Sequence, residues 1–251
     1  MNISPLLAIA LLFAGAFASA QEMPERHVRF LPLGELPPFR QQIRDGIRVE
    51  LEPPPGSIPP REVVLGFGEG PGDSTPLRLG ETTTALKIPP GPGPLLLRQR
   101  DAKEDSKPWL SLSRPENGDF LVLLWRDSRT KTWENARSMV LPDDRVSAPA
   151  GSVRFVNCSP ATIGIALGKE KLLLGAGKMF RRDIPSGKDQ VFQVYLADTS
   201  GGVKVLHAGA LLQNGGERGL VLIYRADGVA ARRPLKVAVR REMVPALPPA
   251  P

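Results

Sequence analysis

The sequence predicts an all-β protein, built as two tandem antiparallel β-sandwich modules that follow an export signal. Three observations lead to this prediction. The chain contains 27 Pro and 25 Gly, residues that helices tolerate poorly and turns use often. Strand-length apolar runs recur about every 10 residues, with turn residues between them. Finally, short patterns of the first half return in the second half in the same order.

The first 20 residues are expected to form a cleavable signal peptide. They carry no charged side chain, include an apolar stretch at 6–18 and end in Ala18-Ser19-Ala20. This stretch is too short to cross a bilayer, which takes about 20 residues. We therefore expect an exported chain, periplasmic or at the cell surface, with no transmembrane span after cleavage.

The second half has the clearest strand pattern. Its apolar runs include SVRFVN, IGIAL, KLLL, VFQVYLA, GVKVLH, LVLIY and LKVAVR, separated by turn segments such as PSGKDQ and NGGERG. LKVAVR alternates, so that Leu235, Val237 and Val239 share one face. LVLIY is apolar on both faces, which is typical of a central strand covered on each side.

The repeated patterns divide the chain into two modules. FLVLLWRD at 120–127 is matched by LVLIYRAD at 220–227, and Val-Arg-Phe occurs at both 28–30 and 153–155. Trp125 and Tyr224 fall at matching positions and are predicted to be core aromatics. A further likeness pairs the segment 77–91 with 165–177, each interpreted as strand, turn and strand.

The predicted boundaries follow from these matches. The first module spans 27–147 with a Pro-rich insertion at 35–60, the second spans 148–243, and a Pro-rich tail covers 244–251. The alternative is one large sandwich, in which the similar segments arise by chance because strands use the same few residue types.

A resemblance accompanies the second module. VRFVNCSP, LGKEKLLLGAG, IPSGKDQVFQVYLAD and LVLIYR together resemble a class of bacterial exported β-sandwich modules of unknown function. These modules are distantly Ig-like or cupredoxin-like in build. The resemblance implies a fold and an extracytoplasmic location, and it carries no catalytic residue.

The residues predict no catalytic, cofactor or metal site. His27 and His207 have no partners at metal-ligand spacing, and no His follows Cys158 closely, which excludes a cupredoxin copper site. Cys158 is expected to be a small apolar side chain at a strand end. The acidic clusters at 101–107 and 141–145 are expected to be solvated loops, although dispersed carboxylates leave a hydrolase open as an alternative.

The two halves of the chain differ in net charge. Residues 21–147 hold 18 Lys and Arg against 19 Asp and Glu, whereas residues 148–251 hold 15 against 7. The predicted contacts with an anionic partner are the paired arginines of the second half: Arg181, Arg182, Arg232, Arg233, Arg240 and Arg241. A basic surface that only keeps the chain soluble is the plainer interpretation.

These observations predict a non-enzymatic binding or scaffolding protein of the cell envelope. Its basic module would contact an anionic glycan, lipid head groups or an acidic protein. Nucleic acid is not expected, because the basic stretch lacks interleaved aromatic residues. The main alternative is a chaperone-like pair of sandwiches that binds an exported subunit by strand addition.

Overall fold

The structure, a computed structural model, describes residues 25–67, 72–89, 93–103, 106–127, 129–197, 202–228 and 233–244. The regular elements of this part of the chain are all β-strands, which confirms the predicted all-β class. The described residues contain no helix long and apolar enough to cross a membrane. The predicted signal peptide and residues 245–251 of the predicted tail lie outside them.

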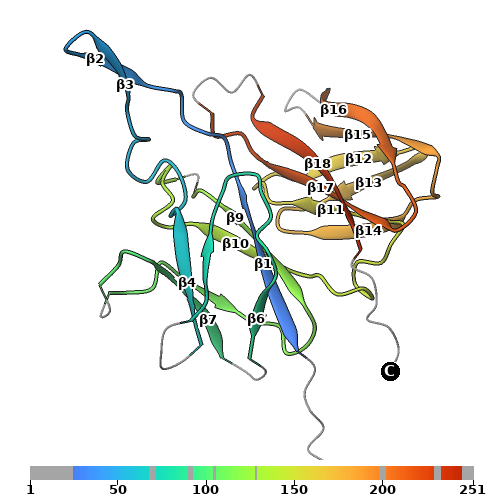
Figure 1. Cartoon of the computed structure of the whole chain (residues 1–251). Helices are drawn as coiled ribbons and strands as arrows, with labels where there is room; N and C mark the ends of the chain where they lie inside the picture. Colours follow the sequence, from blue (N-terminus) through green and yellow to red (C-terminus); the bar gives the residue numbers. More distant parts are fainter. Residues whose placement is uncertain are drawn as a thin grey trace, which may run out of the picture.

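Strands of the first half form two sheets (Figure 1). Sheet I contains, in spatial order, β10 (Arg137–Pro142), β9 (Phe120–Trp125), β1 (Arg26–Leu33) and β6 (Leu86–Ile88). Sheet II contains β5 (Ser74–Pro76), β4 (Glu62–Gly66), β7 (Pro94–Gln99) and β8 (Leu110–Ser113). Outside both sheets, β2 (Gln41–Arg44) and β3 (Ile47–Glu50) form a hairpin that projects from the body.

Strands of the second half form two further sheets. Sheet III contains β14 (Met179–Asp183), β11 (Ser152–Asn157), β17 (Glu217–Arg225) and β18 (Leu235–Met243). Sheet IV contains β13 (Glu170–Leu174), β12 (Ile163–Leu167), β15 (Asp189–Ala197) and β16 (Val203–Leu212). Taken in chain order with the hairpin omitted, the strands of sheets III and IV repeat the spatial order of those in sheets I and II.

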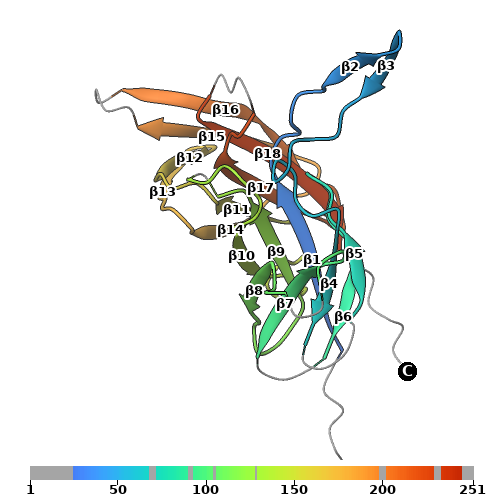
Figure 2. The same cartoon turned by 90° about the vertical axis from the view of Figure 1, so that its left-hand side faces the viewer.

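Three apolar cores lie between these four sheets. The first core lies between sheets I and II and contains Phe30 and Val122, and the second lies between sheets III and IV and contains Phe155 and Val221. A middle core joins sheets I and III through side chains such as Leu123. Both views accordingly place β1 and β9 near β11 and β17 (Figure 1, Figure 2).

The middle core explains why the Leu-Val-Leu strands are apolar on both faces. Along β9, Val122 points into the first core, and Leu121 and Leu123 point into the middle core. Trp125 and Tyr224 both face the middle core, Tyr224 buried and Trp125 partly buried. They therefore pack between sheets I and III rather than inside the first and second cores.

The pairing of the repeated strands differs from the prediction in direction. In sheet I, Val28 of β1 lies opposite Phe120 of β9, and in sheet III, Val153 of β11 lies opposite Gly219 of β17. Both pairs are parallel, so the prediction of wholly antiparallel sheets was wrong at these two places. The reason is that the paired strands are joined by a long crossover through the other sheet.

The inner part of the predicted repeat was also wrong. Residues 77–85 contain no strand, and β6 pairs with β1 in sheet I. By contrast, residues 165–174 belong to the β12–β13 hairpin of sheet IV. In spatial order the counterpart of β12 and β13 is β4 and β5.

Candidate functional site

The arginines predicted from the sequence lie at two opposite edges of sheet III. Arg181 and Arg182 belong to β14, whereas Arg240 and Arg241 belong to β18. Because β11 and β17 lie between these edges, the two pairs are about 14 Å apart at the usual strand spacing. Arg233 precedes β18, and Arg232 lies outside the described residues.

The β14 pair is largely engaged within the chain. Arg182 forms an ion pair with Glu170 of β13. Arg181 donates a hydrogen bond to the carbonyl oxygen of Val146 at 3.0 Å and lies 3.9 Å from the Asp183 carboxylate. These contacts tie β14 to its surroundings. On the β18 side Arg233 likewise donates to the carbonyl oxygen of Leu206, but Arg240 forms no ion pair with a described residue, so this side is the better candidate for a partner.

Two cavities lie between β16 and β18, which are edge strands of sheets IV and III. One cavity of about 280 Å³ lies between residues 206–207 and 235–237. A second, of about 300 Å³, lies between residues 210–213 and 239–241. The two cavities thus follow one another along the same pair of strands. We call them together the β16–β18 groove.

Apolar side chains form much of the groove and cations border it. Leu206, Leu211 and Val237 line the cavities together with Arg233, Arg240 and Arg241. Lys236, which the sequence analysis did not single out, lines the first cavity as well. The only sequence signal for Lys236 was its place in the alternating run LKVAVR.

The groove cations differ in how far they are neutralised. Lys236 donates to Glu35 at 2.8 Å, a contact that raises the pKa of Lys236 and lowers that of Glu35. Arg241 donates to the carbonyl oxygen of Leu212 at 3.1 Å and lies 3.7 Å from Glu217. Arg240 forms no ion pair with any residue that the structure describes.

His207 lies on the β16 side of the groove. Its ring centroid is 4.9 Å from that of Phe192, and burial, followed by the nearby Arg233, lowers its pKa. His207 is therefore neutral at pH 7 and can donate or accept a hydrogen bond there.

A partly buried ion network joins sheets I and III next to the groove. Asp143, just after β10, accepts from Arg29 Nε at 2.9 Å and from Arg154 Nη2 at 2.9 Å, and Arg218 Nη2 lies 3.2 Å away. Glu242 of β18 accepts from Arg29 at 2.7 Å and from Arg218 at 2.7 Å. Burial opposes ionisation of Glu242, but Arg29 and Arg218 outweigh it and lower the pKa of Glu242 to about 2.

This network corrects the expectation that residues 141–145 form a solvated acidic loop. The Asp143 side chain is only 4% exposed, because arginines from sheets I and III surround it. Asp144 accepts hydrogen bonds from the backbone N–H groups of Val146 and Ser147 and so shapes the turn after β10. Both carboxylates therefore have structural partners, which gives no support to a hydrolytic role for them.

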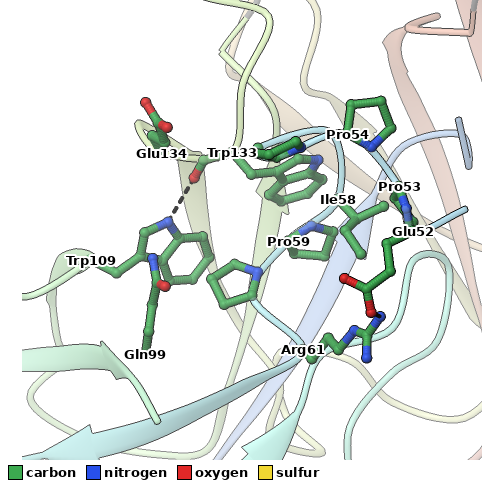
Figure 3. A pocket seen from close by; sticks show the side chains of 13 residues that line it. Glu52, Pro53, Pro54, Ile58, Pro59, Arg61, Gln99, Trp109, Trp133 and Glu134 are labelled. Carbon is green, nitrogen blue, oxygen red and sulfur yellow. Dashed lines mark hydrogen bonds and ion pairs between the residues drawn. The ribbon is translucent and has the colours of Figure 1, made fainter. Parts of the chain in front are cut away.

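A separate cavity of about 300 Å³ lies beneath the Pro-rich part of the insertion (Figure 3). Trp109 Nε1 donates to the carbonyl oxygen of Trp133 at 2.6 Å, and Arg61 lies 3.1 Å from Glu52 at the opposite side. Trp133 is 1% exposed and belongs to the first core. Prolines 53–55 and 59–60 line this cavity and cover the end of that core.

The β2–β3 hairpin is the other part of the insertion, and the sequence analysis missed it. Asp45 and Gly46 both have positive φ, 50° and 79°, which is typical of a type I′ hairpin turn. The side chains of the hairpin are all exposed, and Ile43 and Ile47 are 68% and 67% exposed.

Cys158 and Asn157 are buried without a chemical role. Burial raises the pKa of the Cys158 thiol to about 12, so it is unreactive in the folded chain. Asn157 begins the sequence Asn-Cys-Ser, which matches the acceptor pattern for glycosylation. Its side chain is fully buried and donates to the carbonyl oxygens of Ala161 and Leu174 at 2.7 and 3.0 Å. Among the described residues, no three His, Cys, Asp or Glu side chains form a group that could hold a metal.

No protein-family model matches the chain, and no curated protein matches it in sequence.

Proposed function

We propose that this chain is an exported, non-enzymatic binding or scaffolding protein of the cell envelope, and that its second half contacts an anionic partner through the β16–β18 groove. The observation that carries the proposal is the set of cations along one apolar groove. Arg233, Arg240 and Arg241 border it, although they come from two separate sequence clusters. An anionic glycan, lipid head group or acidic protein segment would meet these charges while its less polar parts cover the groove.

The proposal includes two tandem Ig-like sandwich modules. The repeated strand order supports such a duplication, as does the shared register of β1 with β9 and of β11 with β17. In this scheme the first module supplies the hairpin and the Pro-rich cover, and the second module supplies the basic groove.

Binding to the isolated envelope fraction tests the anionic contact. The mature chain should bind at low salt and release as ionic strength rises, because exposed charges are screened beyond about 10 Å at 0.1 M salt. The double variant Arg233→Gln/Arg241→Gln should weaken binding about tenfold if each lost contact contributes about 0.7 kcal/mol.

A matched control is available on the other edge of sheet III. Arg181→Gln/Arg182→Gln removes the same charge away from the groove and should change binding less than threefold by the same reasoning. Salt-independent binding, or equal weakening by both double variants, would show that the groove does not recognise an anion.

Strand addition is a second candidate, because β16 is a ten-residue edge strand of sheet IV. A partner strand paired to its free edge should slow hydrogen exchange of the β16 amides. Co-purification of an exported protein with the native chain, together with that protection, is the expected result. A partner that leaves β16 exchange unchanged would rule this mode out.

A further inference from the structure

A small cavity lies on the face of β18 opposite the second core. It has a volume of about 170 Å³ and opens between sheets I and III. Leu31, Leu121 and Leu220 form its apolar part. Its polar lining consists of Thr82, Arg154, Arg218, Arg240, Arg241 and Glu242.

The charges around this cavity do not balance. The network below it contains three guanidinium groups, Arg29, Arg154 and Arg218, and two carboxylates, Asp143 and Glu242. One positive charge is therefore left over. Arg240, which has no ion-pair partner among the described residues, adds a second. Uncompensated charge in a partly buried site is unfavourable, and a bound counter-ion relieves it.

One donor of this network also lacks a partner. Arg154 is 3% exposed at its side chain, donates through Nη1 and Nη2, and leaves its buried Nε without an acceptor. A buried charged group with an unmade hydrogen bond destabilises a fold, and a ligand that accepts this bond removes the penalty. Thr82, which precedes β6 of sheet I, also lines the cavity, and its side chain carries a hydroxyl group that can donate a hydrogen bond.

We propose that this cavity binds a single phosphoryl group, held by Arg240, Arg154 and Thr82. A phosphate monoester carries a charge of about −1.5 to −2 at pH 7, which matches the two uncompensated positive charges. Arginine suits such a ligand because its planar fork donates to two oxygen atoms at once. Since a water molecule occupies about 30 Å³ in the liquid, a cavity of about 170 Å³ has the volume of roughly five waters and has room for a phosphoryl group.

The inference rests on the proposed function, because it names the acidic group that an envelope partner would place beside the groove. Free phosphate and the phosphoryl group of a larger molecule share this chemistry. The lining residues come from both sides of the middle core: Arg154 lies on β11 of sheet III, and Thr82 lies in the loop that Gly80 N–H ties to the Pro32 carbonyl oxygen of β1. Binding should therefore tighten the contact between sheets I and III.

Thermal unfolding of the mature chain provides the test. Sodium phosphate at ten times its Kd should raise Tm by about 3 °C over sodium chloride at equal ionic strength and pH. Glycerol 1-phosphate is the second probe. A larger shift with it indicates a substituted phosphoryl group as the natural ligand, and a shift with inorganic phosphate alone indicates the free ion.

Three variants locate the site. Arg240→Gln should weaken phosphate binding at least tenfold, and Thr82→Val should weaken it severalfold without removing charge. Arg225→Gln is the matched control, because Arg225 is an exposed arginine at the far end of the β17–β18 pair. Phosphate should raise the Tm of this control variant as much as it raises the Tm of the unmodified chain.

Three results would overturn the inference. Tm could be equal in phosphate and in chloride, phosphate could raise the Tm of Arg240→Gln as much as that of the unmodified chain, or Arg225→Gln could weaken phosphate binding as much as Arg240→Gln. Should Arg240→Gln fail to fold, Thr82→Val and Arg240→Lys decide the question. Failure here is separable from failure of the groove proposal. Arg233→Gln/Arg241→Gln should weaken envelope binding about tenfold yet keep the rise in Tm with phosphate, since Arg240 and Thr82 remain.

Discussion

Glu242 links the groove strand to the first half of the chain through two arginines. Its carboxylate accepts from Arg29 of β1 and from Arg218 of β17, so a single residue of β18 reaches both sheets. The sequence could not identify this role. Arg29 and Glu242 are 213 positions apart, and no sequence pattern links Glu242 to the Val-Arg-Phe pattern that contains Arg29.

The lowered pKa of Glu242 predicts a specific acid response. With a pKa of about 2 in the folded chain and 4.5 as the ordinary value, its contribution to stability is complete above pH 4.5. That contribution disappears as the pH falls towards 2. Glu242→Gln should therefore lower the free energy of unfolding at pH 7. The difference between this variant and wild type should shrink as the pH falls from 4.5 to 2.

Urea unfolding at pH 7, 4.5, 3 and 2 measures this response, with Glu50→Gln on the exposed hairpin as control. A stability difference for Glu242→Gln that stays constant with pH would mean that the carboxylate gains nothing from Arg29 and Arg218.

Cys158 should report the opening of the middle core. It is 6% exposed there, and burial raises the pKa of its thiol to about 12, so little thiolate exists at pH 8. We expect a thiol reagent to label the native chain at least 100-fold more slowly than the urea-unfolded chain. Rapid labelling of the native chain would place Cys158 at an accessible surface instead.

Among the elements, strands with two apolar faces were the most predictable. SVRFVN and IGIAL coincide with β11 and β12, and LVLIY lies within β17. A strand with few apolar side chains was not predictable in this way. β14 reads MFRRD and is mostly exposed at a sheet edge, so its sequence carries little apolar signal.

The β2–β3 hairpin should contribute little to the stability of the fold. Its eight strand residues are exposed, and the Leu51 N–H donates to the Arg40 carbonyl oxygen at its base. An Asn-Gly turn in place of residues 41–50 should therefore preserve the fold and shift Tm by less than about 2 °C.

Trp133→Ala is the contrasting change in the same region. It removes a fully buried side chain beneath the Pro-rich cover and should lower the free energy of unfolding by about 3–5 kcal/mol. Calorimetry of both variants makes the comparison. A large loss of stability without the hairpin would mean that it packs against the body in solution.

At the scale of the whole molecule, the repeated sequence patterns fall on strands in the same spatial order, but they did not predict how the two halves meet. The repeated Val-Arg-Phe and Leu-Val-Leu patterns fall on strands that face each other across the middle core. Arg29 and Arg154 hold the same place in the two patterns, and both bind Asp143. The sequence predicted two apolar faces for LVLIY, but it could not show that each half covers the outer face of the other.

This arrangement predicts that the chain unfolds as one unit. Separating the halves exposes apolar side chains such as Leu123 and Leu222. It also leaves the charge of Asp143 without some of its arginine partners. The calorimetric and van't Hoff enthalpies of unfolding should therefore agree, as in a two-state transition. Two transitions in the unmodified chain would show that each half is stable without the other.

Asp143→Asn should break this cooperativity selectively. Removing the shared carboxylate leaves Arg29, Arg154 and Arg218 buried with one acidic partner, Glu242, at a cost of about 3–5 kcal/mol. Neither the first nor the second core contains Asp143, so each sheet pair keeps its own packing. We expect a broadened or divided calorimetric transition and faster labelling of Cys158. A variant that instead unfolds in one sharp transition at a lower temperature would mean that the middle core alone couples the two halves.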